Sequence, residues 1–299
     1  MRYAITGAAG HISKPMVQIL LDQGHEVIVI GRNQEHLEEL VKSGARSAIG
    51  SVEDIDFVKK AFARVDAVYT MCPPNMNTSD LAGYCERLGK NYKESIQFNN
   101  IHYVVNLSSV GAHLEEAGHI TGTNRVEQVL NDLPNVNIKH LRPVFFYTNL
   151  FAQIELIRNM GVMGANFSLE KFPVVDPGDV AVTAANYLAE LDFSGHSVRY
   201  IAGDETSTDN IAAMLGEAIG IPGLKWAKFT DEQAFEGFLR GGFPKEAANE
   251  FVKGFRAMHE GRIFEDYWKH APQLEKTKLT DFAKTFAAVW HQHALSPIS

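Results

Sequence analysis

The chain has 299 residues and a formal net charge of −8, and its 28 Lys and Arg residues form no basic run. This balance argues against direct nucleic-acid binding, which requires a basic face. A hydrophobic share of 45% and a charged share of 21% are typical of a globular protein with a full core. No stretch approaches the ~18 apolar residues of a membrane span, and the N-terminus lacks signal-peptide features, so we expect no membrane partner and a cytoplasmic location.

The sequence contains two cysteines, Cys72 and Cys85. So few cysteines in a chain of this length indicate a reducing compartment rather than a disulfide framework. Their spacing matches no metal-ligand pattern, so we expect no metal site.

A glycine-spaced turn, Thr6-Gly7-Ala8-Ala9-Gly10, lies between an apolar run at residues 1–5 and a helix-like run that begins near Lys14. A strand, a glycine turn and a helix in this order form a cradle for a diphosphate, because unpaired N–H groups and the helix dipole favour an anion there. Gly7 permits the tight turn and Gly10 allows close backbone approach. The third small position is Ser13, where the common pattern has glycine.

Residues 1 to about 150 alternate between predicted strands and helices. Such repeated units predict an α/β fold with a Rossmann-type, doubly wound parallel sheet. We expect strands at 1–5, 26–30, 46–50, 66–71, 102–107 and 137–142. We expect helices near 34–43, 54–64 and 79–98. Sites in such sheets lie at the carboxyl ends of the strands.

The pattern changes after residue 150. We expect helices at 146–160, 208–220, 231–239, 245–259 and 279–293, and a further strand at 197–203. The chain therefore divides into an NAD(P)-binding core at 1–150 and a smaller, mostly helical C-terminal lobe at 151–299. We expect this lobe to be integrated with the core and to cover the substrate.

The end of the second predicted strand reads Ile30-Gly31-Arg32-Asn33. Sites for NAD usually place an acidic residue there to bind the ribose 2′-hydroxyl, and none is present. Arg32 could form paired hydrogen bonds with a 2′-phosphate, which favours NADP(H) over NAD(H). The alternative is a solvated loop arginine.

Several ordered motifs together resemble the NmrA-like proteins, which are atypical members of the short-chain dehydrogenase/reductase superfamily. They are the glycine turn, Gly31-Arg32-Asn33, Asn106-Leu107-Ser108-Ser109-Val110-Gly111, residues 142–150 and residues 176–181. That family includes NAD(P)H-dependent quinone reductases, aromatic-alcohol reductases and NADP-binding regulators without turnover.

The resemblance implies a set of cofactor-binding residues. Gly7, Gly10, His11 and Ile12 would hold the diphosphate, and Arg32 would meet the adenosine phosphate. The nicotinamide end would lie among Met71, Cys72, Pro73, Ser108, Pro143, Phe145 and Phe146. The family often has Gly-Asp after the third strand, whereas this chain has Gly50-Ser51.

The candidate catalytic residues are Ser109 and His119. The Tyr-x-x-x-Lys pair of ordinary superfamily members is absent, and Thr123 stands where the resemblance would place a lysine. Ser109 could polarise a carbonyl. His119 could donate a proton, or it could be a helix-capping or solvent-facing histidine.

Two further features leave alternatives open. Cys72 could be a reactive thiol or a small apolar residue beside the cofactor. The aromatic residues Phe145, Phe146, Tyr147 and Phe151 could stack on an aromatic substrate or belong to the core.

Two functions follow from these features. The first is an NADP(H)-dependent oxidoreductase that reduces a small quinone-like or aromatic carbonyl acceptor. The second is a non-catalytic NADP-binding redox sensor that acts through a protein partner. A nucleotide-sugar epimerase is disfavoured because the Tyr-x-x-x-Lys pair is missing.

Overall fold

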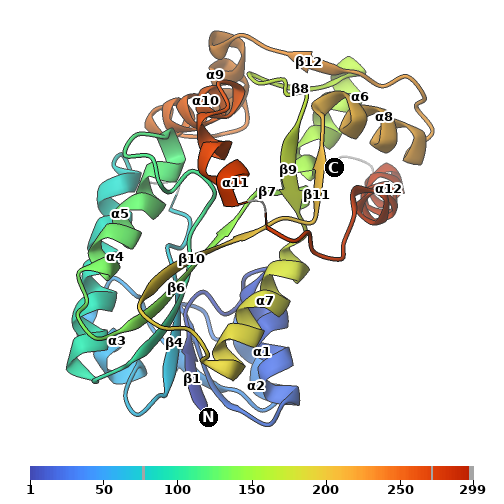
Figure 1. The fold of residues 1–299 in the computed structure, drawn as a ribbon. Coiled ribbons are helices and arrows are strands. Elements are labelled where there is room, and N and C mark those ends of the chain that lie inside the picture. The colour runs from blue at the N-terminus through green and yellow to red at the C-terminus, as the bar shows by residue number, and fades with distance from the viewer. Residues whose placement is uncertain (76–77, 271, 296–299) are drawn as a thin grey trace.

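The computed structural model describes residues 1–75, 78–270 and 272–295, with the side chains of 293–295 left out. Its centre is a seven-stranded sheet in the order β10-β6-β5-β4-β1-β2-β3, in which all neighbouring strands are parallel (Figure 1). The strands are β1 (Arg2–Ile5), β2 (Glu26–Gly31), β3 (Arg46–Ile49), β4 (Ala67–Met71), β5 (Tyr103–Leu107), β6 (Asn137–Pro143) and β10 (His196–Ile201).

Helices cover both faces of this sheet (Figure 1). One face carries α1 (Ser13–Asp22), α2 (Glu38–Lys42), which follows the 3-10 turn Glu35–Leu37, and α7 (Pro177–Glu190). The other carries α3 (Ile55–Ala61), α4 (Leu81–Phe98) and α5 (Thr121–Asn131), which follows the 3-10 turn Gly118–Ile120. Alternate strand residues face opposite sides, so Tyr3 and Ile5 join one hydrophobic core and Ala4 joins the other. The predicted doubly wound α/β fold is therefore confirmed.

A second, largely helical region lies beyond the carboxyl ends of the strands (Figure 1). Its short strands form two small sheets, one of β7 (Phe145–Phe146), β9 (Phe172–Val175) and β11 (Asp204–Thr206), the other of β8 (Met163–Ala165) and β12 (Trp226–Lys228). Its helices are α6 (Ile154–Met160), α8 (Thr208–Ala218), α9 (Asp231–Arg240), α10 (Lys245–His259), α11 (Glu265–His270) and α12 (Leu279–Leu295), with 3-10 segments at Tyr147–Gln153 and Arg262–Phe264.

Two elements after residue 150 belong to the layers of the central sheet. The predicted strand at 197–203 is β10, which pairs with β6, and α7 packs against α1. Helix α7 starts because Asp176 caps it by accepting from the Gly178 N–H, with Pro177 at the first turn. The division at residue 150 stays a prediction, and these two elements show how closely both parts are joined.

The helix expected at 146–160 is only partly right. Phe145 and Phe146 pair with β9, the next residues form a 3-10 segment, and a regular α-helix begins at Ile154. Strand pairing with β9 therefore overrides the helical spacing of the aromatic residues.

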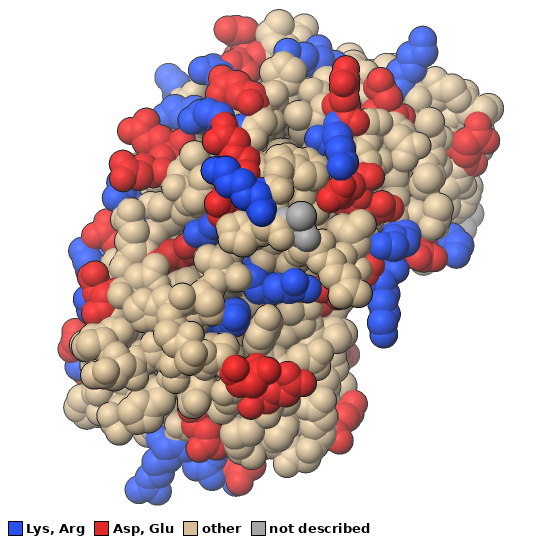
Figure 2. Space-filling model, viewed as in Figure 1, with Lys and Arg blue, Asp and Glu red and all other residues tan. Residues whose placement is uncertain are grey.

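Acidic and basic side chains are interspersed over the face shown in Figure 2, without a single large basic area. Among the described residues, no helix combines the length and the apolar character needed to cross a membrane.

Candidate functional site

The glycine turn places the start of α1 at the carboxyl edge of the sheet. Gly7 has φ +60°, and its carbonyl accepts a hydrogen bond of 2.9 Å from the Gly10 N–H. Ile12, at the N-cap, supplies no side-chain hydrogen bond, and no described residue accepts from the N–H groups of His11, Ile12 or Ser13. These donors fit a diphosphate, because a helix start with unpaired N–H groups favours an anion.

The turn is closely packed against the sheet. A Cβ atom on Gly7 would lie 2.7 Å from the Met71 Sδ atom, so only glycine fits there without a shift. Met71 is held by its carbonyl, which accepts from the Tyr92 hydroxyl at 2.8 Å. Ser13 is buried and its hydroxyl donates to the Thr6 carbonyl at 3.5 Å, so this third small position serves close packing of α1 on the sheet.

Arg32 follows β2 and is exposed, with no hydrogen bond or ion pair to another described residue. Its guanidinium is thus available for a ligand phosphate. The next turn along the edge contains Ser51, whose hydroxyl accepts from the Glu53 N–H at 3.2 Å. The Ser51 side chain therefore stabilises the turn in which it lies, at the position where NmrA-like proteins often have an aspartate.

The sequence-based expectation about the cysteines is wrong. Cys72 and Cys85 form a disulfide with their Cα atoms 5.7 Å apart, so Cys72 is neither a free thiol nor an isolated apolar residue. The two meet because α4 begins shortly after β4 and returns along it. Gly122 of α5 allows this packing, since a Cβ there would lie 2.7 Å from the Cys85 Sγ atom. The predicted cytoplasmic location stays a prediction.

Ser108 and Pro143 follow β5 and β6 beside each other. The Ser108 N–H donates to Leu141 and the Val110 N–H donates to the Pro143 carbonyl at 2.9 Å. The Ser108 hydroxyl donates to Glu127, a buried carboxylate on α5. Ser108 is therefore a buried residue whose hydroxyl already has a partner.

Glu127 also forms an ion pair with Arg142. This pair was not predicted from the sequence. Arg142 extends this buried network to the Tyr200 hydroxyl at 2.9 Å and to Asp266 on α11 at 3.2 Å. Burial by itself lowers the pKa of the guanidinium, but the Glu127 carboxylate raises it above its ordinary value. The network connects the end of β5 to the helical region above it.

A cavity of about 860 Å³ opens next to these strand ends. It brings together Ser109, His119, Thr123, Phe145 and Phe146, which the sequence analysis had singled out separately. The opposite wall is aromatic and comes from the C-terminal region, a contribution the sequence analysis missed: Phe167, Trp226, Phe229, Phe238, Phe243, Phe251, Phe255 and Phe264. The volume suits a drug-sized, largely apolar ligand.

His119, in the 3-10 turn before α5, packs against this aromatic wall and is not a solvent-facing loop residue. Its ring stacks on Phe251 with centroids 4.3 Å apart, and its Nδ1 atom is buried against Gly254 of α10. Burial lowers the pKa of His119 to about 4, against a weaker opposing effect of the Glu250 backbone. At neutral pH the imidazole is uncharged, which weakens it as a proton donor. The neighbouring Thr123 hydroxyl donates to the Ile120 carbonyl at 2.8 Å.

The aromatic residues that follow β6 separate into two groups. Phe145 and Phe146 line the cavity. Tyr147 stacks on Phe282, and Phe151 packs against Phe286, both on α12. The first pair can therefore meet a substrate, whereas the second pair belongs to the core.

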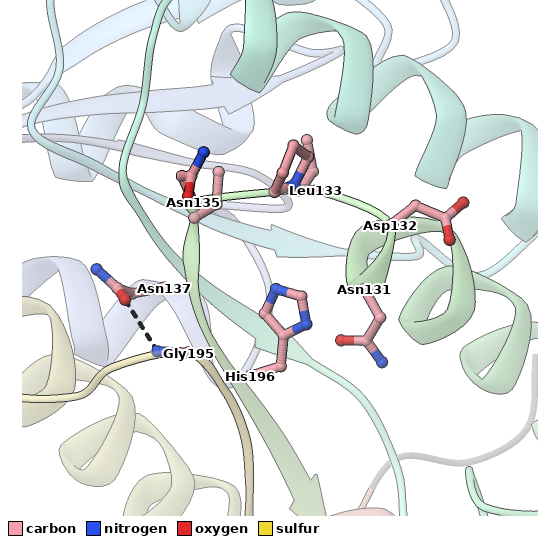
Figure 3. Close-up of a pocket in the computed structure, with 9 residues that line it drawn as sticks. Asn131, Asp132, Leu133, Asn135, Asn137, Gly195 and His196 are labelled. Carbon is pink, nitrogen blue, oxygen red and sulfur yellow. Dashed lines mark hydrogen bonds between the residues drawn. The ribbon is translucent and has the colours of Figure 1, made fainter.

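A second, more polar hollow of about 690 Å³ lies at the other edge of the sheet (Figure 3). It is bordered by residues 131–137 and by Gly195 and His196, where β6 and β10 begin. The Gly195 N–H donates to the Asn137 side chain at 2.9 Å. This hollow is at the amino ends of the strands and takes no part in the candidate site. Among the described residues, no group of three His, Cys, Asp or Glu side chains could hold a metal ion.

Comparisons with known proteins agree with this geometry. Residues 7–135 match the NAD(P)H-binding family, so this part of the chain is an NAD(P)H-binding domain. An uncharacterised protein of Schizosaccharomyces pombe is 43% identical over 68 residues, a match that spans 23% of this chain and 23% of that protein.

The fold is shared with solved reductases. The NADPH-dependent quinone oxidoreductase of Escherichia coli, in complex with NADPH, matches with a TM-score of 0.81 at 18% identity over 95% of this chain and 99% of its own. The Citrobacter sp. triphenylmethane reductase in complex with NADP(H) matches with a TM-score of 0.74, also at 18% identity, over 95% and 99%. UDP-glucose 4-epimerase from Bifidobacterium longum matches with a TM-score of 0.67 at 14% identity over 98% of both chains. At these identities the likeness shows that the chain shares the fold of these proteins, and no more.

Proposed function

We propose that this protein is an NADP(H)-dependent oxidoreductase that reduces a small quinone-like or aromatic carbonyl acceptor. The observation that supports this most strongly is the aromatic cavity, which begins at Ser109 and Val144 beside the strand ends where a dinucleotide would lie. The names of the similar reductases agree with it.

The residues present fit a dinucleotide. The N–H groups of His11 and Ile12, with Gly7 and Gly10, would hold the diphosphate, and the unpaired Arg32 would bind the 2′-phosphate of NADP(H). Met71, Cys72, Pro73, Ser108, Pro143, Phe145 and Phe146 would border its nicotinamide end. When bound, the dinucleotide supplies a hydride.

The chain's own residues would mainly bind and orient the acceptor. Phe145 and Phe146 offer aromatic faces, and the apolar walls exclude water. Ser109, which lines the cavity, would polarise an oxygen of the acceptor. Among the described residues that line the cavity we identify no strong proton donor, because His119 is neutral and Thr123 stands where the resemblance would place a lysine. This suits a quinone, whose reduced oxygens can take protons from water, better than it suits a ketone.

The test is NADPH oxidation with a panel of quinones and matched aromatic aldehydes and ketones. We expect turnover of quinones well above that of the carbonyl compounds. A Phe146→Ala variant should lower kcat/KM, with Phe98→Ala as the control because Phe98 is 70% exposed and does not line the cavity. Failure to exceed the uncatalysed rate with every acceptor would refute the proposal.

The second candidate is an NADP-binding redox sensor that acts through a protein partner. This function is favoured because the candidate proton donors are weak: the Thr123 hydroxyl already donates a hydrogen bond to the Ile120 carbonyl, and His119 is neutral. A sensor must bind the oxidised and reduced dinucleotides with different affinities, because a ligand shifts an equilibrium only by differential affinity. Equal dissociation constants for NADP⁺ and NADPH by calorimetry would exclude it.

A further inference from the structure

The cavity carries one fixed charge. Arg240 is the single Lys, Arg, Asp or Glu among the described residues that line it. The other polar lining groups are neutral at pH 7, including His119, whose pKa burial lowers. An uncompensated cation at the rim of an apolar cavity favours an anionic ligand, because an anion pairs with it and a cation is repelled.

Arg240 lies where the cavity opens. The exposed lining residues are Asn149, Ala152, Met160, Gln233, Gly237, Arg240 and Gly241, and four of these belong to α9 or the turn after it. The buried lining residues, such as Val110 and Val144, lie at the strand ends. A ligand that fills the cavity therefore has one end at the strand ends and the other near Arg240.

The guanidinium of Arg240 is unpaired. No hydrogen bond or ion pair joins it to another described residue, whereas the next arginine along the chain, Arg256, pairs with Asp231. As the last residue of α9, Arg240 also complements the helix dipole, so its effect on stability must be measured separately from its effect on binding.

We infer that the cavity selects an aromatic ligand that carries an anionic group, such as a carboxylate, at the end remote from the reacting ring. This inference rests on the proposed function for the identity of the site, but it concerns ligand binding and can be tested without turnover. The aromatic walls hold the rings, and Arg240 pairs with the anion at the opening.

The test uses three non-reducible probes of similar ring size: 2-naphthoate, its neutral methyl ester and a 2-naphthyltrimethylammonium cation. Their dissociation constants are measured by calorimetry with and without NADP⁺. Arg240→Gln should weaken naphthoate binding about threefold to fivefold at low salt, the range of a partly exposed ion pair. The same substitution should leave the affinity for the ester unchanged and increase the affinity for the cation.

The matched control is Lys245→Gln, because Lys245 is exposed at the start of α10, close in sequence, and does not line the cavity. Arg240→Lys should retain the preference for naphthoate. The inference is overturned if Arg240→Gln changes the three probes equally or not at all, if Lys245→Gln has the same effect, or if the wild-type protein binds none of them. A preserved preference for naphthoate without turnover of any quinone or carbonyl acceptor would instead refute the proposed function alone.

Discussion

The guanidinium of Arg142 forms two parallel hydrogen bonds to the carboxylate of Glu127, at 2.9 and 2.6 Å. Both side chains are more than nine-tenths buried. Arg142 is on β6 and Glu127 on α5, so the pair joins the sheet to a covering helix directly behind Ser108.

Glu127→Gln should lower the free energy of unfolding by about 3 kcal/mol, because it leaves the buried Arg142 charge without its main partner. Urea denaturation at pH 7 measures this. Glu39→Gln is the control, since Glu39 pairs with Lys14 on the surface and its loss should leave the free energy nearly unchanged. Similar effects of the two substitutions would show that the buried pair is not special.

Because His140 is buried, we expect the folded protein to lose stability in mild acid. It is buried between Asn106, whose amide lies 3.1 Å from Nδ1, and Asn131, which is 3.0 Å from Nε2. Burial lowers the pKa of His140 to about 4, with weaker effects from Glu127 and Arg142. As the pH falls, His140 therefore takes up a proton near pH 6.5 in the unfolded chain but only near pH 4 in the folded protein.

The stabilising contribution of neutral His140 is complete above pH 6.5 and is lost as the pH falls to about 4. His140→Gln should reduce the slope of unfolding free energy against pH in this window by up to about 1.4 kcal/mol per pH unit, the value for one proton. Denaturation curves between pH 4 and 7 test this. An unchanged slope would mean that His140 titrates normally in the folded protein.

Gly7→Ala should disrupt both backbone and packing at the turn. A residue with a side chain is strained at φ +60°, and the new Cβ would approach Met71. Gly24→Ala is a matched control, because Gly24 has φ +79° but no atom within 4 Å of the added Cβ. We expect both variants to have a lower Tm, whereas only Gly7→Ala should lose NADPH binding in calorimetry. Equal binding by the two variants would contradict this role of the turn.

The sequence predicted the layers better than it predicted the contacts between them. Residues 6–13 specify the turn because glycine spacing acts locally, and residues 245–259 form α10 as the helical pattern indicated. The aromatic wall of the cavity was missed because Phe251 and Phe255 meet His119 only through the tertiary fold. Glu127 and Arg142 are 15 positions apart on different elements, and nothing in their local sequence marks them as partners.

The sequence led us to expect no disulfide, and this expectation was wrong for a related reason. The number of cysteines indicates the compartment only on average. Whether a bond forms depends on whether the fold brings the two residues together, and here they are separated by 13 positions.

Cys85→Ser should lower the free energy of unfolding by about 3 kcal/mol under oxidising conditions, as expected for a closed loop of this size. A dithiol reductant should destabilise the wild-type protein and have no effect on the variant. Two free thiols in the unfolded, unreduced wild-type protein would contradict the bond.

Arg32 provides the test of dinucleotide preference. If its unpaired guanidinium binds the 2′-phosphate, Arg32→Ser should weaken NADPH binding about tenfold or more, because hydrogen bonds between charged groups contribute strongly. NADH binding should be unchanged, since NADH lacks that phosphate. Arg46→Ser is a suitable control, because Arg46 is an exposed arginine on the adjacent strand β3, where it approaches Glu26. Parallel loss of both dinucleotides in Arg32→Ser would instead indicate a general effect of the loop, and equal affinity of the wild-type protein for NADPH and NADH would refute the preference itself.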